Sequence, residues 1–144
     1  MNKTFTLHRQ LANDCIVLED LPLSRLLLCN DSAFPWFILV PRLSDVQDIY
    51  QLTWQDQQQL LNESSLLSEL LMQEFSGDKM NVAALGNVVP QLHIHHIVRF
   101  KNDPCWPKPI WGQQALIPYK EAELTRIKKR LLPKLAILLA DNSI

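Results

Sequence analysis

The sequence predicts an α+β protein made of five strands and two helices. Short apolar, β-branched runs in the first forty residues predict strands, and leucines at helical spacing after Thr53 predict a long helix. The third observation is size, because 144 residues with 47% apolar side chains suffice for one globular domain with a sizeable core. We therefore expect a single domain over residues 1–144.

The first three strands are expected at 15–21, 25–30 and 36–40. The first two are apolar runs on either side of Pro22, which is the pattern of a hairpin. The third is β-branched and aromatic, and Pro41 ends it because proline has no N–H to donate to a neighbouring strand.

The long helix is expected to begin after Thr53, which with Asp56 three positions later resembles a capping box. The stretch Ser76-Gly77-Asp78 supplies its end. The apolar residues that recur at helical spacing between these points are Leu60, Leu61, Leu67, Leu70, Leu71 and Phe75. We expect them on one side of the helix, with polar residues on the other.

Two more strands are expected at about 80–85 and 93–100, separated by Gly86-Asn87 and Pro90. The Pro- and Trp-rich segment 103–111 cannot be regular and is expected to be an ordered loop or a docked tail.

A C-terminal helix is expected over 119–132, and Pro133 is expected to kink or end it. Within the single domain, residues 1–112 then form the core and 113–144 a helical extension.

Charge and composition exclude several classes of function. Lys plus Arg number 14 against 15 for Asp plus Glu, a balance that argues against binding DNA or RNA by backbone electrostatics. The apolar runs are far shorter than a membrane span needs. The N-terminus lacks the apolar stretch of a secretory signal, so we expect a cytoplasmic, reducing location.

Cys15, Cys29 and Cys105 are an odd number at wide spacing, so we interpret them as free thiols. A nucleophilic cysteine is the functional alternative. For the first two, a place in an apolar strand favours simple burial.

The most informative feature is the run of three histidines in four positions, His93, His95 and His96. In a strand, alternate side chains share a face, so His93 and His95 lie together, flanked by the amide of Gln91 and the guanidinium of Arg99. His96 points to the opposite, apolar face and is expected to be a packing residue.

Three interpretations of the paired histidines remain open. They can be hydrogen-bonded surface residues, or an H-x-H metal pair, although no Cys, Asp or Glu lies nearby to complete a zinc site. The third is nucleophilic catalysis or anion binding at a phosphate, for which neutral imidazole is suited and neighbouring donors are favourable.

The run from Gly86 to Ile97, with Gln91-Leu92-His93-Ile94-His95-His96-Ile97 at its end, resembles the signature of the histidine triad (HIT) family. That signature is His-φ-His-φ-His-φ-φ, with φ apolar, and here glutamine stands at the first histidine. Two stretches, 28–31 and 35–42, are similar to the family's nucleotide-pocket strands. The resemblance covers about residues 5–112 and implies a bacterial-type HIT protein with a five-stranded antiparallel sheet, one long helix and a C-terminal helix.

The resemblance assigns roles by position. His93 matches the histidine that attacks the α-phosphorus of a nucleotide, and His95 matches the one that contacts the phosphate and assists proton transfer. Asn30 matches the residue that binds ribose, Asn87 a polar residue near the leaving group, and Asn81 a further polar wall. Aliphatic residues of the first hairpin, including Leu18 and Leu28, would enclose the base.

Two positions depart from the family's pattern. Gln91 can donate a hydrogen bond but cannot carry a proton, and Trp36 takes the place of a histidine in the substrate pocket. The leading expectation is a nucleotide hydrolase or nucleotidyl transferase that cleaves at the α-phosphate of a dinucleoside polyphosphate, phosphoramidate or similar compound. The alternative is a nucleotide-binding or interaction module with lost or weak catalysis.

The resemblance also implies partners. No metal or other cofactor is expected for the covalent step, and Mg²⁺ enters only as the companion of a polyphosphate substrate. A homodimer is expected, because exposed sheet edges need covering. Trp106 and Trp111 resemble the family's tail, which reaches the partner subunit's site, but they also suit a hydrophobic plug.

Overall fold

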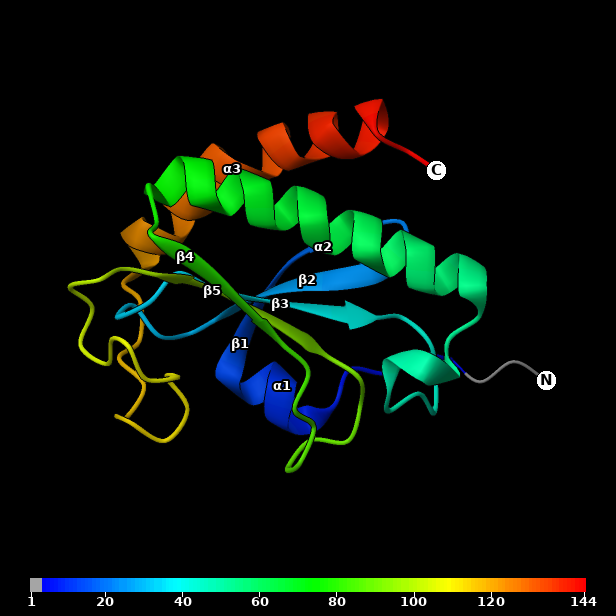
Figure 1. Ribbon diagram of the computed structural model, residues 1–144, viewed down its shortest axis with the longest axis horizontal. Helices are drawn as coiled ribbons and strands as arrows, with labels where there is room; N and C mark the ends of the chain where they lie inside the picture. The colour runs from blue at the N-terminus through cyan, green and yellow to red at the C-terminus, as the bar shows by residue number, and fades with distance from the viewer. Residues whose placement is uncertain (1–3) are drawn as a thin grey trace.

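The structure, a computed structural model, describes residues 4–144 and contains a five-stranded sheet and three α-helices (Figure 1). The strands are β1 (Cys15–Asp20), β2 (Ser24–Cys29), β3 (Trp36–Pro41), β4 (Lys79–Ala83) and β5 (Ile94–Arg99). The helices are α1 (Arg9–Asp14), α2 (Trp54–Phe75) and α3 (Glu121–Asp141), with a 3-10 turn η1 (Ile49–Gln51). The predicted α+β class and its antiparallel sheet with a long and a C-terminal helix are confirmed.

Strand order explains why the histidine run lies inside the sheet. The order is β1-β2-β3-β5-β4, and every neighbouring pair is antiparallel. Strand β5 is therefore inserted between β3 and β4, and His95 lies opposite Ile38 on one side and Ala83 on the other. An inner strand cannot shift its register without breaking two ladders, so the direction of each histidine is fixed.

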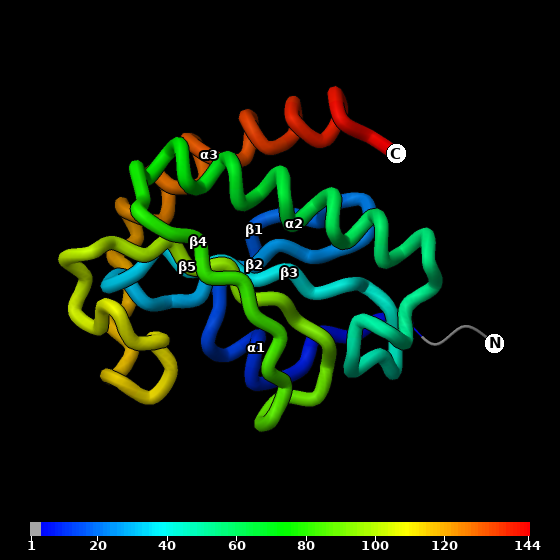
Figure 2. Tube along the Cα trace, viewed as in Figure 1, coloured from blue at the N-terminus to red at the C-terminus, as the bar shows by residue number. Residues whose placement is uncertain are grey.

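The two faces of the sheet carry separate hydrophobic clusters. Helices α2 and α3 lie side by side over one face, whereas α1 lies on the other (Figure 2). Leu28, Phe37 and Val98 point toward the long helices. Cys29 and Ile38, one position along in their strands, point to the α1 face. Because side chains alternate along a strand, one face of the sheet packs against α2 and α3, and the other face remains available for a binding site.

The structure corrects two details of the sequence interpretation. Helix α1 was not predicted, because its six residues are too few for an apolar period to register. Helix α3 passes through Pro133 and continues to Asp141 rather than ending there. Pro133 is on the exposed side, while Leu131 and Leu135 stay buried on either side of it, so water is able to reach the carbonyl that lacks its partner.

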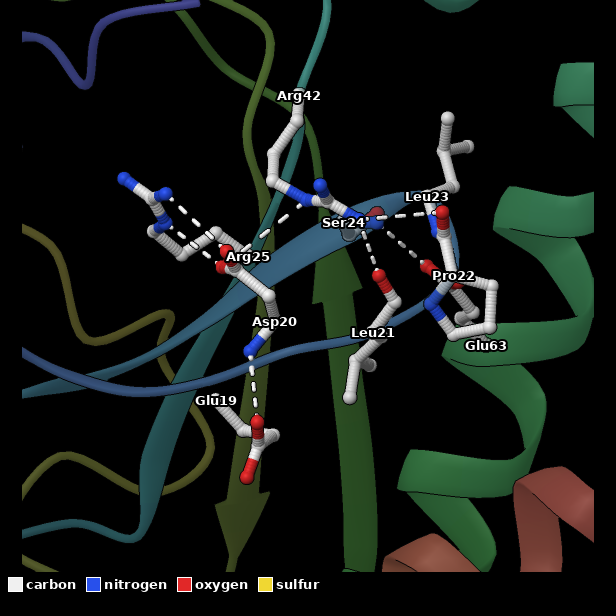
Figure 3. Close-up of polar contacts among 9 residues, drawn as sticks. All are labelled: Glu19, Asp20, Leu21, Pro22, Leu23, Ser24, Arg25, Arg42 and Glu63. Atoms are coloured by element: carbon white, nitrogen blue, oxygen red, sulfur yellow. Dashed lines mark hydrogen bonds and ion pairs between the residues drawn. The ribbon is translucent and has the colours of Figure 1, made fainter.

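A buried carboxylate fastens the long helix to the first hairpin. Glu63 of α2 is fully buried, and its oxygens accept the backbone N–H groups of Leu23, at 2.8 Å, and Ser24, at 3.0 Å (Figure 3). Gln59, one turn earlier, donates its amide to the same carboxylate at 2.9 Å. The same turn is held from outside by Arg42, which donates to the carbonyls of Leu21 and Pro22.

We expect Glu63→Ala to lower the free energy of unfolding by about 3 kcal/mol, because two buried N–H groups lose their acceptor. Urea denaturation followed by tryptophan fluorescence measures the loss. Glu69→Ala, an exposed site on the same helix, is the control and should change the value by less than about 0.5 kcal/mol. Equal effects of the two substitutions would contradict the role given to Glu63.

Candidate active site

A cavity of about 440 Å³ opens on the sheet face that α2 and α3 leave free. Its volume is in the range of small-molecule sites. Its lining comes from α1, the first three strands, the segment between β4 and β5, and the chain after β5, and consists of Gln10, Leu11, Asp14, Cys15, Cys29, Trp36, Ile38, Leu85, Gly86, Asn87, Val88, Val89, His93, His95, Trp111 and Leu116. Most of the lining is apolar, with a few polar groups among it.

His93 presents a free ring nitrogen. Its Nδ1 lies 2.7 Å from the backbone oxygen of Gln91, and because a carbonyl only accepts, Nδ1 carries the hydrogen and Nε2 a lone pair. The side chain is 7% exposed, and burial lowers the pKa of the imidazole below its ordinary value. His93 is thus a neutral imidazole with an unprotonated nitrogen at pH 7, which is the form that acts as a nucleophile.

His95 lies beside it, with ring centroids 4.9 Å apart and the rings nearly perpendicular. Burial, and more weakly the neighbouring His93, lower the pKa of His95 to about 3. The indole Nε1–H of Trp36 donates to Nδ1 of His95 at 3.0 Å, and Trp111 packs edge-on against the same ring at 5.2 Å. The two histidines therefore form a neutral pair, in which His95 packs against the rings of Trp36 and Trp111.

His96 occupies the opposite face, as the alternation of a strand predicts. It is fully buried, its Nε2 lies 2.7 Å from the Ser64 hydroxyl of α2, and its Nδ1 lies 3.0 Å from the carbonyl of Ile94. Burial lowers the pKa of His96 to about 4. It serves as a hydrogen-bonded core residue that joins β5 to α2.

The structure brings four of the predicted site residues to the cavity, namely His93, His95, Asn87 and Trp36. Gln91 is not among them. Its amide donates to the carbonyl of Thr6 at 2.9 Å and accepts the N–H of His8 at 2.8 Å. It thereby holds the segment that leads into α1, whose residues do line the cavity.

Arg99 and Asn81 also lie outside the cavity lining. The Arg99 guanidinium is 1% exposed and pairs with Asp103 through two bonds of 2.7 and 3.0 Å, while its third nitrogen donates to Asn81 at 3.0 Å. Asp103 in turn accepts the N–H groups of Cys105 and Trp106. This network fastens the Pro- and Trp-rich loop to the sheet, and Trp106 itself packs over the guanidinium.

Asn30 and the aliphatic residues of the first hairpin are placed differently from the expectation as well. The side-chain oxygen of Asn30 accepts the N–H of Tyr119 at 2.9 Å and so positions the chain ahead of α3. Leu18 and Leu28 belong to the cluster under the long helices. The apolar walls of the cavity come from strand residues that point to the opposite face of the sheet, including Cys29 and Ile38.

Sequence reasoning missed the contribution of α1. Asp14, at its C-terminal end, is the one acidic residue among the described lining residues, and its carboxylate accepts the Gln10 amide at 2.7 Å. Nothing in the local pattern marks Asp14, because only the docking of a six-residue helix on β1 brings it to the site.

The cysteines of the described chain are all free. Cys15 and Cys29 are cross-strand partners that line the cavity, and the hydrogen bond between them, together with burial, raises the pKa of the Cys29 thiol. A raised pKa disfavours the thiolate and so disfavours Cys29 as the nucleophile.

Across residues 4–144 there is no group of three or more His, Cys, Asp or Glu side chains arranged to hold a metal ion. None of the described helices is long and apolar enough to cross a membrane.

Two neutral imidazoles at an inner strand of this antiparallel sheet, turned toward a largely apolar cavity, define the class of protein: a histidine triad fold. The comparisons agree. The model of the HIT domain matches residues 10–102. The chain therefore belongs to the HIT family, whose members are in general nucleotide-binding hydrolases and transferases, and the resemblance noted in the sequence is confirmed.

Solved structures of bacterial histidine triad proteins are closely similar. One from Marinobacter aquaeolei VT8 is 53% identical with a TM-score of 0.92, covering 94% of this chain and 99% of that one. One from Bradyrhizobium japonicum is 40% identical with a TM-score of 0.90, covering 92% and 99%. One from Sinorhizobium meliloti 1021 is 39% identical with a TM-score of 0.88, covering 90% and 96%. No match was found among curated proteins.

The buried histidines make stability fall at acid pH. The pKa of His96 is about 4 in the folded chain and about 6.5 when unfolded, so the unfolded state binds its proton first as the pH drops below 6.5. We expect this residue alone to cost on the order of 3 kcal/mol of unfolding free energy between pH 7 and pH 4. His96→Gln, which keeps a donor and an acceptor but does not titrate, should flatten the pH dependence measured by urea denaturation; an unchanged slope would contradict this.

Proposed function

We propose that the protein cleaves nucleoside phosphates at the α-phosphate through a covalent nucleotidyl intermediate on His93. The observation that carries the proposal is the free Nε2 of a neutral His93 at a cavity large enough for a nucleotide. The carbonyl of Gln91, which accepts Nδ1–H, would stabilise the positive charge that the ring gains when Nε2 bonds to phosphorus.

The reaction proceeds in two displacements. His93 Nε2 forms a bond to the α-phosphorus while the bond from phosphorus to the leaving group breaks, and the leaving group departs with the electron pair and takes up a proton. Water then attacks the same phosphorus, its proton passes to solvent, and His93 regains its lone pair as the nucleoside monophosphate is released. We assign the contact with the phosphoryl oxygens to His95, and the distance of 4.9 Å between its ring centroid and that of His93 supports this assignment.

The remaining lining divides into a nucleoside half and a phosphate half. Leu11, Cys29 and Ile38 offer apolar walls for a base. Asp14 offers a carboxylate to vicinal ribose hydroxyls, the role that the resemblance had given to Asn30. We assign the phosphate and leaving-group side to Asn87, on the segment before β5, because it lines the same cavity as the two histidines.

The charge of the cavity favours a substrate with few negative charges. Its described lining contains no Lys or Arg, both histidines are neutral at pH 7, and Asp14 contributes a carboxylate. A phosphoramidate, in which an amine leaves from a single phosphoryl group, suits such a site better than a dinucleoside polyphosphate. A polyphosphate would need Mg²⁺ as its companion to offset its charge.

The proposal includes a homodimer formed through the β4 edge. Strand β4 has one pairing partner, β5, and its outward Val82 is 50% exposed beside Leu61 of α2, which is 60% exposed. An open strand edge bordered by exposed apolar side chains is the kind of surface that a second copy covers.

We expect wild-type protein to release AMP from adenosine 5′-phosphoramidate faster than from diadenosine polyphosphates, and His93→Ala to lose at least about a thousandfold in turnover because the nucleophile is gone. Binding of AMP, followed by calorimetry, should be nearly unchanged in the variant. Trapping with radiolabelled substrate should show a covalent adduct in the wild type alone. Measurable AMP binding with no turnover of any substrate by the wild type would favour the binding-module alternative.

We expect Asp14→Ala to raise KM for ribonucleotides about tenfold, because a hydrogen-bonded charged acceptor for the ribose is removed. The KM for 2′-deoxynucleotides should rise less, so the preference for ribose falls. Asn13→Ala, on the exposed side of the same short helix, is the matched control. If both substitutions leave the ribose preference intact, Asp14 does not bind the sugar.

A further inference from the structure

Trp36 makes a directed contact with His95. It is the first residue of β3, it is 9% exposed, and its indole nitrogen lies 3.0 Å from Nδ1 of His95. The two rings are tilted by 49° with centroids 5.8 Å apart, so the contact is made through the indole edge and not by stacking. Trp111 packs perpendicular to Trp36, at 6.4 Å between centroids, and buttresses it.

The chemistry of this contact determines where the proton of His95 sits. An indole Nε1–H is a donor only, so the nitrogen that faces it must hold a lone pair. A neutral imidazole carries one hydrogen, which is therefore on Nε2. An imidazolium carries hydrogens on both nitrogens and would set an N–H against the indole N–H across 3.0 Å.

We propose that Trp36 is a positioning residue that fixes His95 as the neutral Nε2–H tautomer, so that His95 offers the substrate a single N–H donor and never acts as a cation. The inference about substrate rests on the proposed function, whereas the tautomer is a property of the protein alone. His95 then stabilises phosphoryl oxygens by a hydrogen bond, and the leaving group takes its proton from solvent.

The surroundings of His95 reinforce this assignment. The titratable groups near it are His93 in the same cavity and His96 on the same strand, both of which lower its pKa, and Asp14, Cys15 and Cys29, which line the cavity from α1, β1 and β2. On the neighbouring strands it lies opposite Ile38 and Ala83, which are apolar.

Nitrogen-15 NMR of the imidazole rings tests the tautomer directly in the unmodified chain. In the wild type between pH 5.5 and pH 8, we expect Nδ1 of His95 to resonate as an unprotonated nitrogen, Nε2 as a protonated one, and neither to titrate. A wild-type spectrum with hydrogen on Nδ1 overturns the proposal without any variant.

Two substitutions then separate the hydrogen bond from simple packing. Trp36→Phe removes the donor and keeps a ring, so His95 should show mixed tautomers, with the hydrogen on Nδ1 in part of the population. Trp111→Phe alters a ring that also packs against His95 but has no hydrogen bond to it, and should preserve the wild-type tautomer. The same spectrum in both variants would overturn the proposal.

Kinetics connect the tautomer to the reaction. Relative to the wild type, kcat of Trp36→Phe should fall several-fold, because part of the His95 population no longer presents Nε2–H to the phosphoryl oxygens. An unchanged kcat would contradict the role in the reaction. If instead no substrate is cleaved by the wild type but the NMR result holds, the proposed function fails and the tautomer assignment stands.

Discussion

The insertion of β5 between β3 and β4 is the constraint on which the rest of this molecule depends. Because both edges of β5 are hydrogen-bonded, its side chains cannot change sides, and consecutive histidines are committed to different tasks. His95 turns toward the cavity and Trp36, whereas His96 turns toward Ser64 beneath α2. The Trp36 N–H faces Nδ1 of His95 and the Ile94 carbonyl faces Nδ1 of His96, so each ring has a neighbour that specifies which nitrogen carries the hydrogen.

Polar residues at or near the ends of β2 and β5 hold the segments that form the cavity's walls. Gln91 ties down the segment before α1, Asn30 the segment before α3, and Arg99 with Asp103 the loop after β5. Each of these side-chain hydrogen bonds holds a connecting segment that does not pair with any strand of the sheet. The cavity is consequently shaped by hydrogen bonds made outside it, and its chemistry is left to the few groups that remain free.

Local patterns predicted most of the fold but only part of the site. Thr53 does cap α2, and the histidine spacing placed His93 and His95 together, because both depend on neighbours close in the chain. The hydrogen bond between Asn30 and Tyr119 could not be predicted from the sequence, because the two residues lie 89 positions apart. The contribution of Asp14 depends in the same way on the docking of a short helix, which only the packed chain reveals. The spacing of residues along the chain predicts contacts within one helix or strand, but it does not predict which distant residues pair in the folded chain.

The absence of a cationic side chain from the described lining has a kinetic consequence for ligand capture. A cavity whose described lining has no cationic side chain, in a chain whose net charge is −1, exerts no long-range attraction on an anion. Encounter then proceeds without electrostatic steering, and added salt does not weaken binding in the way that it weakens binding to a cationic pocket. Such a site selects its ligand only after contact, by shape and hydrogen bonding. It does not attract small anions, which a positively charged pocket would attract and bind in competition with the ligand.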